Sequence, residues 1–599
     1  MPQRSHAWIT AVAASILLLL PAALADFGSG SLGAGIEVRA PAGSGGVLGQ
    51  DRVGTQDAAG MRGASGTFAT SPVTAGGEAD ELMAAFRSDL ELLIGTGSLS
   101  EQWSVVVVSV EQGDTIFALN ADAPMAPASN MKLFTSAAAL HLLGPDFRFP
   151  TYLLADGPVV DGVLEGNLVL YGTGDPTLGG RAPARPVGAY EVFLQALRDA
   201  GIRQVRGEVI GDGSYYSGNP RRPSWNPADL DNWYAAPVSA LTFNENMVTV
   251  RVAPARAAGL PTQVHTIPEG AGVPIRNESR VAAGGGSVAV FRDHPDGPIR
   301  VTGAMRPRQV EVWRNITVAD PPSYAASVLR ATIEAGGISV EGKATAEGDP
   351  GSRGARGAPR VTDRLLVAPA FSPSRNLRTV AVHHSEPVSE LIHPVNRRSH
   401  NLFAETLLFA MGRVTGETSD FDGGARAMHR FLVEEVGADE ASLHIEDGSG
   451  LSRMNRTTAR DLVRLLGYME ASPHVGAFHE SLPEAGNRLG LRRMERSAAA
   501  GNLRAKTGTI HRTSALSGLV HGAEGERLLF SILVNDVPST GAAKRAEDRV
   551  GIHLAGFRRG VPFILPTREG VSMARTEALR PFPQVDSDRD RPTVTDDRP

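Results

Sequence analysis

Pro127-Ala-Ser129-Asn-Met-Lys132-Leu-Phe-Thr-Ser-Ala-Ala-Ala-Leu140 is the stretch on which the fold assignment depends. Its apolar residues have helical spacing, which predicts a helix from about Ser129 to Leu143. Ser129 and Lys132 then lie one turn apart on the same face at the start of that helix. A serine nucleophile with a lysine base requires this arrangement, because the amine must reach the hydroxyl and lose its proton. The positive end of the helix dipole and a second nearby cation both favour that loss.

Lysine is rare in this chain, which makes each one informative. Only four of the 59 basic residues are lysines, namely Lys132, Lys343, Lys506 and Lys544. A lysine can shed its proton in a suitable site, whereas an arginine effectively cannot. Two of the four lysines fall in motifs that suggest chemistry, Lys132 above and Lys506 below.

The second motif is Arg504-Ala-Lys506-Thr507-Gly508-Thr509, immediately upstream of two expected strands, Ser514 to His521 and Arg527 to Val534. An exposed Lys-Thr-Gly on a strand offers a cation and a hydroxyl for a carboxylate, and its glycine lets a substrate backbone approach closely. In a sequence of average composition, the number of Lys-Thr-Gly motifs expected by chance from four lysines is only about a few hundredths.

A third motif, Ser-x-Asn, is ambiguous in this sequence. We select Ser399-His-Asn401, because it introduces the amphipathic run Asn401 to Leu408 and its polar atoms can be fixed at the edge of a packed helix. Ser374-Arg-Asn376 is the main rival. Two further pairs also fit the pattern, Ser217/Asn219 and Ser224/Asn226.

Ser-x-x-Lys, Ser-x-Asn and Lys-Thr-Gly, in this order, occur in penicillin-binding proteins and serine β-lactamases. From about residue 79 to 562 the chain resembles the class C low-molecular-mass penicillin-binding proteins, the D-alanyl-D-alanine carboxypeptidase/endopeptidase family. The 270-residue interval from Ser129 to Ser399 also resembles the large insert of that family. Further segments carry the resemblance: Thr135-Ser-Ala-Ala-Ala-Leu140, Leu143-Gly144-Pro-Asp146, Gly174-Asp175-Pro-Thr-Leu178, Ala236-Pro237-Val-Ser-Ala-Leu241, His384-Ser-Glu-Pro387, Asp447-Gly-Ser-Gly-Leu-Ser-Arg453 and Ser517-Gly518.

The resemblance implies a mixed α/β fold. Its catalytic domain would be transpeptidase-like, as in serine β-lactamases, with about five antiparallel strands flanked by helices. We expect this domain in two segments, 78–156 and 376–562, interrupted by a large β-rich insert at 157–375 that could form two subdomains. Gly-rich composition predicts a disordered linker at 26–77, and the Pro-, Asp- and Arg-rich composition of 563–599 predicts a disordered tail.

The resemblance also implies a role for each catalytic residue. Ser129 would form an acyl-enzyme with the penultimate D-alanine of a peptidoglycan stem peptide or cross-link, and Lys132 would take its proton. Ser399 would pass a proton to the departing amine. Asn401 would hold Lys132 and the substrate amide, and Lys506 would supply positive potential. β-Lactam antibiotics would be covalent inhibitors, and no cofactor is expected.

The substrate contacts follow in the same way. Thr507 would bind the terminal carboxylate of the substrate, with Gly508 allowing close approach. The backbone N–H groups of Ser129 and Thr509 would form the oxyanion hole. Asp175, in the insert, would contact the amine end of a diaminopimelate side chain. We expect no metal, because the spacing of the histidines at 383, 384 and 393 matches no zinc pattern.

The N-terminus has the pattern of a secretory signal peptide. Arg4 precedes an apolar stretch from Ala7 to Leu20, and Ala23-Leu24-Ala25 forms a small-x-small cleavage site. We therefore expect an exported, periplasmic protein that is cleaved near Ala25 and has no transmembrane segment in the mature chain.

Composition excludes several classes of function. A net charge of −6 gives no basic surplus for nucleic acid, and the absence of cysteine excludes disulfides, thiolate metal sites and cysteine nucleophiles. The residues themselves leave two alternatives to a peptidase open. One is a catalytically weak scaffold that binds the cell wall, and the other is a β-lactamase or esterase of the same fold. The intact Ser129, Lys132 and Lys506 argue against the scaffold.

Overall fold

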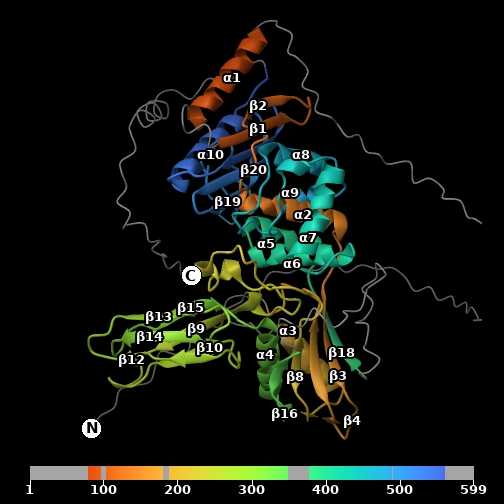
Figure 1. Cartoon of the computed structure of the whole chain (residues 1–599), viewed down its shortest axis with the longest axis vertical. Coiled ribbons are helices and arrows are strands. Elements are labelled where there is room, and N and C mark those ends of the chain that lie inside the picture. Colours follow the sequence, from red (N-terminus) through yellow and green to blue (C-terminus); the bar gives the residue numbers. More distant parts are fainter. Residues whose placement is uncertain (1–77, 96–102, 180–187, 348–376, 489, 560–599) are drawn as a thin grey trace, which may run out of the picture. The chain divides into compact units, whose positions relative to one another are not determined.

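The computed structural model describes residues 78–95, 103–179, 188–347, 377–488 and 490–559 (Figure 1). The predicted signal peptide, Gly-rich linker and C-terminal tail lie outside these residues, as does the rival Ser374-Arg-Asn376. No helix of the described part is long and apolar enough to cross a membrane.

One five-stranded sheet forms the centre of the catalytic part. Its strands follow the order β19-β20-β21-β1-β2, and every neighbouring pair is antiparallel. The two strands expected from Ser514 to His521 and from Arg527 to Val534 are both part of this sheet. Its strands are β1 (Trp103–Ser109), β2 (Thr115–Leu119), β19 (Arg504–Ile510), β20 (Thr513–His521) and β21 (Arg527–Val534).

The sequence of β1 shows why this sheet is covered on both faces. Four consecutive valines leave no polar face, which is typical of a strand buried on both sides. Val105 and Val107 belong to one apolar core, whereas Val106 and Val108 belong to another. Successive side chains of a strand point to opposite faces, so the sheet separates these two cores.

Helices cover each face (Figure 1). On one face, α10 (Thr540–Ala555) contacts β20, and α1 (Glu78–Ile94) packs on α10. On the other face, α8 (Ala459–Glu470) contacts β1 and β21 and also the buried helix α2 (Met131–Leu142). The remaining helices of this layer are α5 (Val388–Arg397), α6 (Asn401–Val414), α7 (Phe421–Phe431) and α9 (Val475–Ser481).

The insert contains a second five-stranded sheet, of order β17-β8-β6-β3-β18. Strands β3 and β18 pair with each other, although the predicted boundaries at residues 156 and 376 assigned both to the catalytic segments. The strand pairing therefore places both in the sheet of the insert. Its strands are β3 (Pro150–Asp156), β6 (Asn167–Gly172), β8 (Val209–Asp212), β17 (Ala344–Ala346) and β18 (Leu377–His384).

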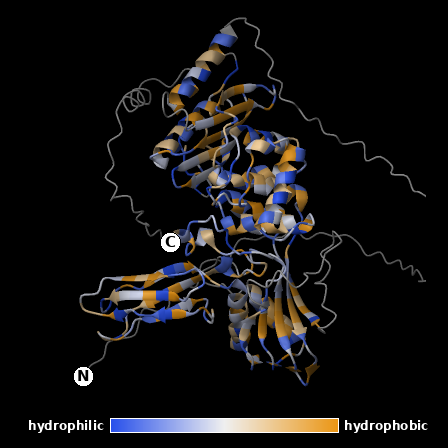
Figure 2. Cartoon of the chain, viewed as in Figure 1, coloured by the Kyte–Doolittle hydropathy of each residue, from blue (hydrophilic) through white to orange (hydrophobic). Residues whose placement is uncertain are grey.

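The rest of the insert is made of short strands and two helices. Helices α3 (Gly188–Asp199) and α4 (Pro321–Ala335) bury Tyr190, Phe193 and Tyr324 in a core that is separate from those of the catalytic part. Figure 2 shows the alternation of apolar and polar residues along the insert strands. Three smaller sheets complete it: β4 (Val159–Val160), β5 (Val163–Leu164), β7 (Gln204–Val205) and β16 (Ser339–Val340); β9 (Met247–Ala253), β10 (Gln263–Ile267) and β15 (Val312–Thr317); and β11 (Ile275–Asn277), β12 (Arg280–Val281), β13 (Ser287–Phe291) and β14 (Ile299–Met305).

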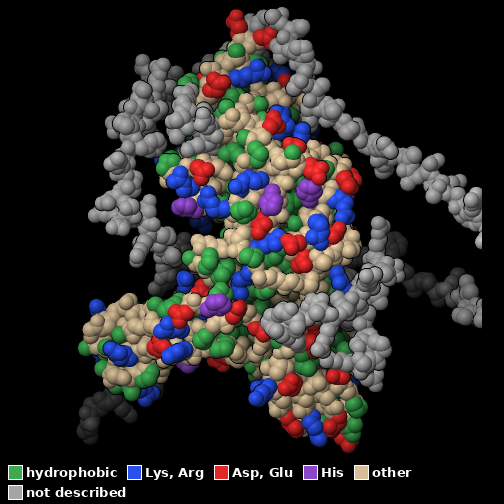
Figure 3. All heavy atoms as spheres, viewed as in Figure 1, with side chains coloured by type: hydrophobic (Ala, Val, Ile, Leu, Met, Phe, Trp, Pro, Cys, Tyr) green, Lys and Arg blue, Asp and Glu red, His purple; other side chains and the backbone are tan. Residues whose placement is uncertain are grey.

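The surface carries both signs of charge. On the face shown in Figure 3, acidic and basic side chains are interspersed rather than gathered by sign. A basic surface of the kind that binds phosphate backbones is not visible on that face.

Candidate active site

Ser129 lies in a short 3₁₀ turn, Ala128–Asn130, and the α-helix begins only at Met131. The predicted helix start was therefore two residues early. The backbone of Ala128 has a φ of +47°, a left-handed conformation that turns the chain sharply just before Ser129. Ser129 is half-buried, whereas Lys132 is completely buried.

The Lys132 amine has three acceptor atoms around it. Its Nζ lies 3.0 Å from Ser129 Oγ, 2.7 Å from Asn401 Oδ1 and 2.6 Å from the Ser449 carbonyl oxygen. A neutral amine has two N–H groups and one lone pair. If the N–H groups are donated to Asn401 and Ser449, the lone pair is left for the hydroxyl proton of Ser129.

Burial favours this neutral form. It lowers the pKa of Lys132 from 10.5 to about 7, an effect that the nearby carboxyl groups of Glu405 and Asp447 oppose. A pKa near 7 is suited to a general base at neutral pH.

Ser399 and Lys506 form a second pair. Lys506 Nζ donates to Ser399 Oγ at 3.0 Å and to the Thr507 carbonyl oxygen at 2.8 Å. Ser399 has a φ of +55°, which places the residue in a tight turn between α5 and α6. Burial, followed by the charge of Lys132, lowers the pKa of Lys506 well below its ordinary value, so the positive charge expected there is disfavoured without an anion.

Strand β19 packs closely against the segment that carries Ser129. A Cβ atom at Gly508 would lie 2.9 Å from Asn130 Nδ2 and 2.9 Å from the Pro127 carbonyl oxygen, so only glycine fits there without a shift. This contact brings the Lys-Thr-Gly strand beside the nucleophile. Thr507 is half-buried and Thr509 is exposed, so both can meet a substrate.

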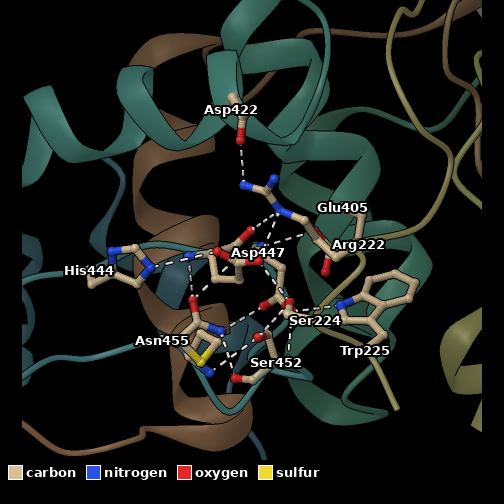
Figure 4. A network of polar contacts seen from close by, with 12 residues as sticks. Arg222, Ser224, Trp225, Glu405, Asp422, His444, Asp447, Ser452 and Asn455 are labelled. Carbon is tan, nitrogen blue, oxygen red and sulfur yellow. Dashed lines mark hydrogen bonds and ion pairs between the residues drawn. The ribbon is translucent and has the colours of Figure 1, made fainter. Parts of the chain in front are cut away.

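Sequence patterns did not indicate the residues that hold the turn carrying the Ser449 carbonyl. They belong to the segment Asp447–Ser452, here called the Asp447 turn, and to Glu405 of α6 (Figure 4). Asp447 Oδ1 accepts from the Gly450 N–H at 2.7 Å, and Oδ2 accepts from the Ser452 N–H at 2.7 Å. The resemblance had included this segment, but nothing in its sequence indicated a contact with Lys132.

The insert also reaches the site. Trp225 Nε1 donates to Asp447 Oδ2 at 2.9 Å, and Asn401 Nδ2 donates to the Tyr234 carbonyl oxygen at 2.7 Å (Figure 4 shows the former). Asn401 therefore links Lys132 to the insert through the two ends of its amide.

Asp175 is buried inside the insert. Its side chain is 1% exposed, and one oxygen accepts from the N–H and the hydroxyl of Thr177 at 2.7 and 2.6 Å. The other oxygen lies 3.4 Å from His383 Nε2. The buried carboxylate is thus engaged inside the insert, and its predicted contact with a diaminopimelate amine stays a prediction.

A groove of about 490 Å³ lies between α5 and the insert. The C-terminal end of α5 with Arg398 lines one side, and Thr177, Leu178 and Glu245 of the insert line the other. Its walls carry both signs of charge.

Comparison with known proteins accounts for most of the chain. The D-Ala-D-Ala carboxypeptidase 3 (S13) family matches residues 87–362 and 359–555. The chain belongs to this family. As an S13 member it is 32% identical over 487 residues to a D-alanyl-D-alanine carboxypeptidase of Actinomadura sp. (strain R39), covering 79% of this chain and 84% of that relative. It is also 24% identical over 439 residues to the D-alanyl-D-alanine carboxypeptidase DacB of Haemophilus influenzae, covering 72% of this chain and 84% of that relative.

The solved structures support the fold of this S13 protein. Penicillin-binding protein 4 (dacB) of Haemophilus influenzae matches with a TM-score of 0.62 and 23% identity, covering 78% of this chain and 99% of that one. The predicted family, the mixed α/β fold with its insert and the enzyme class are confirmed.

Proposed function

We propose that this S13 protein is an exported serine-type D-Ala-D-Ala carboxypeptidase and endopeptidase, which acts on peptidoglycan stem peptides and cross-links through an acyl-enzyme on Ser129. The observation that carries the mechanism is the completely buried Lys132 amine, 3.0 Å from Ser129 Oγ, with its other partners arranged for the neutral form. Export rests on the predicted signal peptide, with cleavage near Ala25.

Acylation follows from this geometry. Ser129 Oγ attacks the carbonyl carbon of the penultimate D-alanine while Lys132 Nζ takes the hydroxyl proton. The backbone N–H groups of Ser129 and Thr509 stabilise the oxygen that becomes negative in the tetrahedral intermediate. Because Lys132 becomes charged in this step, the carbonyl of Ser449 and the oxygen of Asn401 stabilise its extra proton.

Collapse of the intermediate breaks the bond to the leaving amine, which must gain a proton. Ser399 Oγ donates that proton and is resupplied from Lys506, its hydrogen-bond partner at 3.0 Å. Before deacylation, the proton that Lys132 took from Ser129 passes through solvent to Lys506, which restores both lysines. Water then attacks the acyl carbonyl while neutral Lys132 takes its proton, and that proton returns to Ser129 Oγ when the acyl bond breaks. In the described part of the chain Lys506 Nζ has two acceptors, so the third N–H of its charged form is available to the substrate carboxylate, which would raise the pKa of Lys506 on binding.

For the endopeptidase part of the proposal, the groove between α5 and the insert, which includes Arg398 but none of the catalytic residues, would hold the distal part of a cross-linked peptide. A volume of about 490 Å³ is large enough for several peptide residues beyond the scissile bond, whereas a carboxypeptidase releases only one D-alanine. Its mixed charge suits a stem peptide, which carries both carboxylates and amines.

Digestion of purified cross-linked muropeptides and of pentapeptide monomers, followed by mass spectrometry, tests the proposal. We expect monomers from the dimers and loss of one D-alanine from the pentapeptides, and neither product with Ser129→Ala. Unchanged muropeptides would favour the scaffold alternative. A chromogenic β-lactam separates the other alternative: a long-lived acyl-enzyme is expected, and rapid turnover would indicate a β-lactamase.

A further inference from the structure

The Asp447 turn decides the direction of the Lys132 lone pair, because its Ser449 carbonyl accepts one of the amine protons at 2.6 Å. The turn also packs against the backbone next to the nucleophile. A Cβ atom at Gly450 would lie 1.8 Å from the Ala128 carbonyl oxygen, and Gly450 itself has a φ of +78°. A shift of this turn would therefore displace the Lys132 acceptor.

Glu405 holds two successive amides of that turn. Its Oε2 accepts from the Gly448 N–H at 2.8 Å and its Oε1 accepts from the Ser449 N–H at 2.9 Å. Glu405 lies on α6, one turn after Asn401, and is completely buried. Helix α6 thus supplies one direct partner of Lys132, Asn401, and supports the other, the Ser449 carbonyl, through Glu405. On the far side of the same turn, Thr135 of α2 donates to the Gly448 carbonyl oxygen at 2.6 Å.

We propose that Glu405 is a positioning residue for the Lys132 base: by accepting both amides it orients the Ser449 carbonyl, so that the lone pair of the amine faces Ser129. The proposal rests on the proposed function, since it assumes that Lys132 is the base. Glu405 does not touch the substrate. It acts only through the turn and through its charge.

The charge adds a second, measurable effect. The groups that face Glu405 are Lys132 of α2 and Asp447 of the turn, and Lys506 of β19 faces Lys132. Burial, and then the like charge of Asp447, raises the pKa of Glu405 to about 8, while a negative charge on Glu405 favours the protonated form of Lys132. Below about pH 8 the Glu405 carboxyl is therefore mostly protonated and neutral, and only at higher pH does it accept both amides as a carboxylate.

Glu405→Gln tests this effect through the pH profile of acylation by a fluorescent penicillin. We expect the plateau to fall about ten- to a hundredfold, since a glutamine oxygen accepts and its NH₂ group repels an amide N–H, which displaces the turn. The deficit relative to the wild type should grow as the pH rises through about 8, because the wild-type carboxyl ionises there whereas glutamine stays neutral. A role confined to folding would give a deficit that does not change with pH.

Glu405→Asp separates position from charge. The shorter side chain keeps the carboxylate but cannot reach both amides, so we expect a wild-type acid limb with a lowered plateau. Glu547→Gln is the matched control, because Glu547 is another completely buried glutamate, bonded to Ser514 and Arg493 away from Lys132. Its profile should match the wild type.

Two results would overturn the proposal: a deficit of Glu405→Gln that does not change with pH, or a wild-type plateau in Glu405→Asp. Should the glutamine variant fail to fold, the aspartate variant decides alone. If the wild type itself is not acylated, the proposed function fails together with the inference. If penicillin labels the wild type and the deficit of Glu405→Gln is the same at every pH, only the inference fails.

Discussion

Replacing Lys132 with arginine preserves the charge of the residue but removes its ability to act as a base. An ordinary lysine with a pKa of 10.5 is neutral in about one molecule in three thousand at pH 7, whereas the buried amine, with a pKa of about 7, is neutral in about half. Burial therefore increases the active form about a thousandfold. Arginine keeps its proton at every accessible pH.

We expect Lys132→Arg to reduce acylation by about 10²- to 10⁴-fold, the usual effect of losing a general base. The rate of labelling by a fluorescent penicillin, measured from about pH 5 to pH 9, is the readout. The wild type should lose activity as the pH falls through about 7, because protonation removes the lone pair, and the variant should show no such limb. Wild-type labelling rates in the variant, or a wild-type rate that shows no limb near 7 and still rises steeply at the upper end of the pH range, would refute the assignment of Lys132 as the base.

Three further predictions concern the surroundings of the base. Ser399→Ala should slow acylation or turnover about 10²- to 10⁴-fold, because the hydroxyl bonded to Lys506 is lost. Ser374→Ala should be labelled like the wild type, and the reverse result would assign the Ser-x-Asn motif to Ser374. Gly508→Ala should destabilise the site by about 1–3 kcal/mol and slow labelling, because its Cβ would lie 2.9 Å from atoms of Asn130 and Pro127. The control Gly188→Ala, whose Cβ would face open space, should change neither the labelling rate nor the melting temperature. Trp225→Phe should lower the free energy of unfolding by about 1–3 kcal/mol through the lost hydrogen bond to buried Asp447, and an unchanged melting temperature would contradict the contact.

The sequence predicted those parts of the fold that depend on local patterns. The helical spacing of Leu82, Phe86 and Leu90 lies in α1, and the valine run of β1 is typical of a strand covered on both faces. The insert boundary was misplaced because β3 and β18 pair across more than 220 residues of chain, and no local pattern records such a partner. The 3₁₀ turn at Ser129 was missed for a different reason: the positive φ of Ala128 is set by packing, not by the preference of alanine.

The same distinction applies to the active site. Ser129, Lys132 and Lys506 could be proposed from their motifs, because each motif is a short local pattern in the sequence. Glu405 could not, because a glutamate in an amphipathic helix is normally expected on the solvent face. Its partners lie more than 40 residues later, in a turn whose sequence suggests only a tight bend.

Two completely buried lysines in one site have a consequence for the order of events. Each amine disfavours a positive charge on the other, and burial disfavours a charge on both. A substrate carboxylate that reaches Lys506 stabilises its protonated form, and the new charge then opposes a proton on Lys132 as well. Binding of a substrate with the correct terminal carboxylate would therefore favour the neutral base at the moment Ser129 must be deprotonated. Recognition and activation would in this way depend on the same anion.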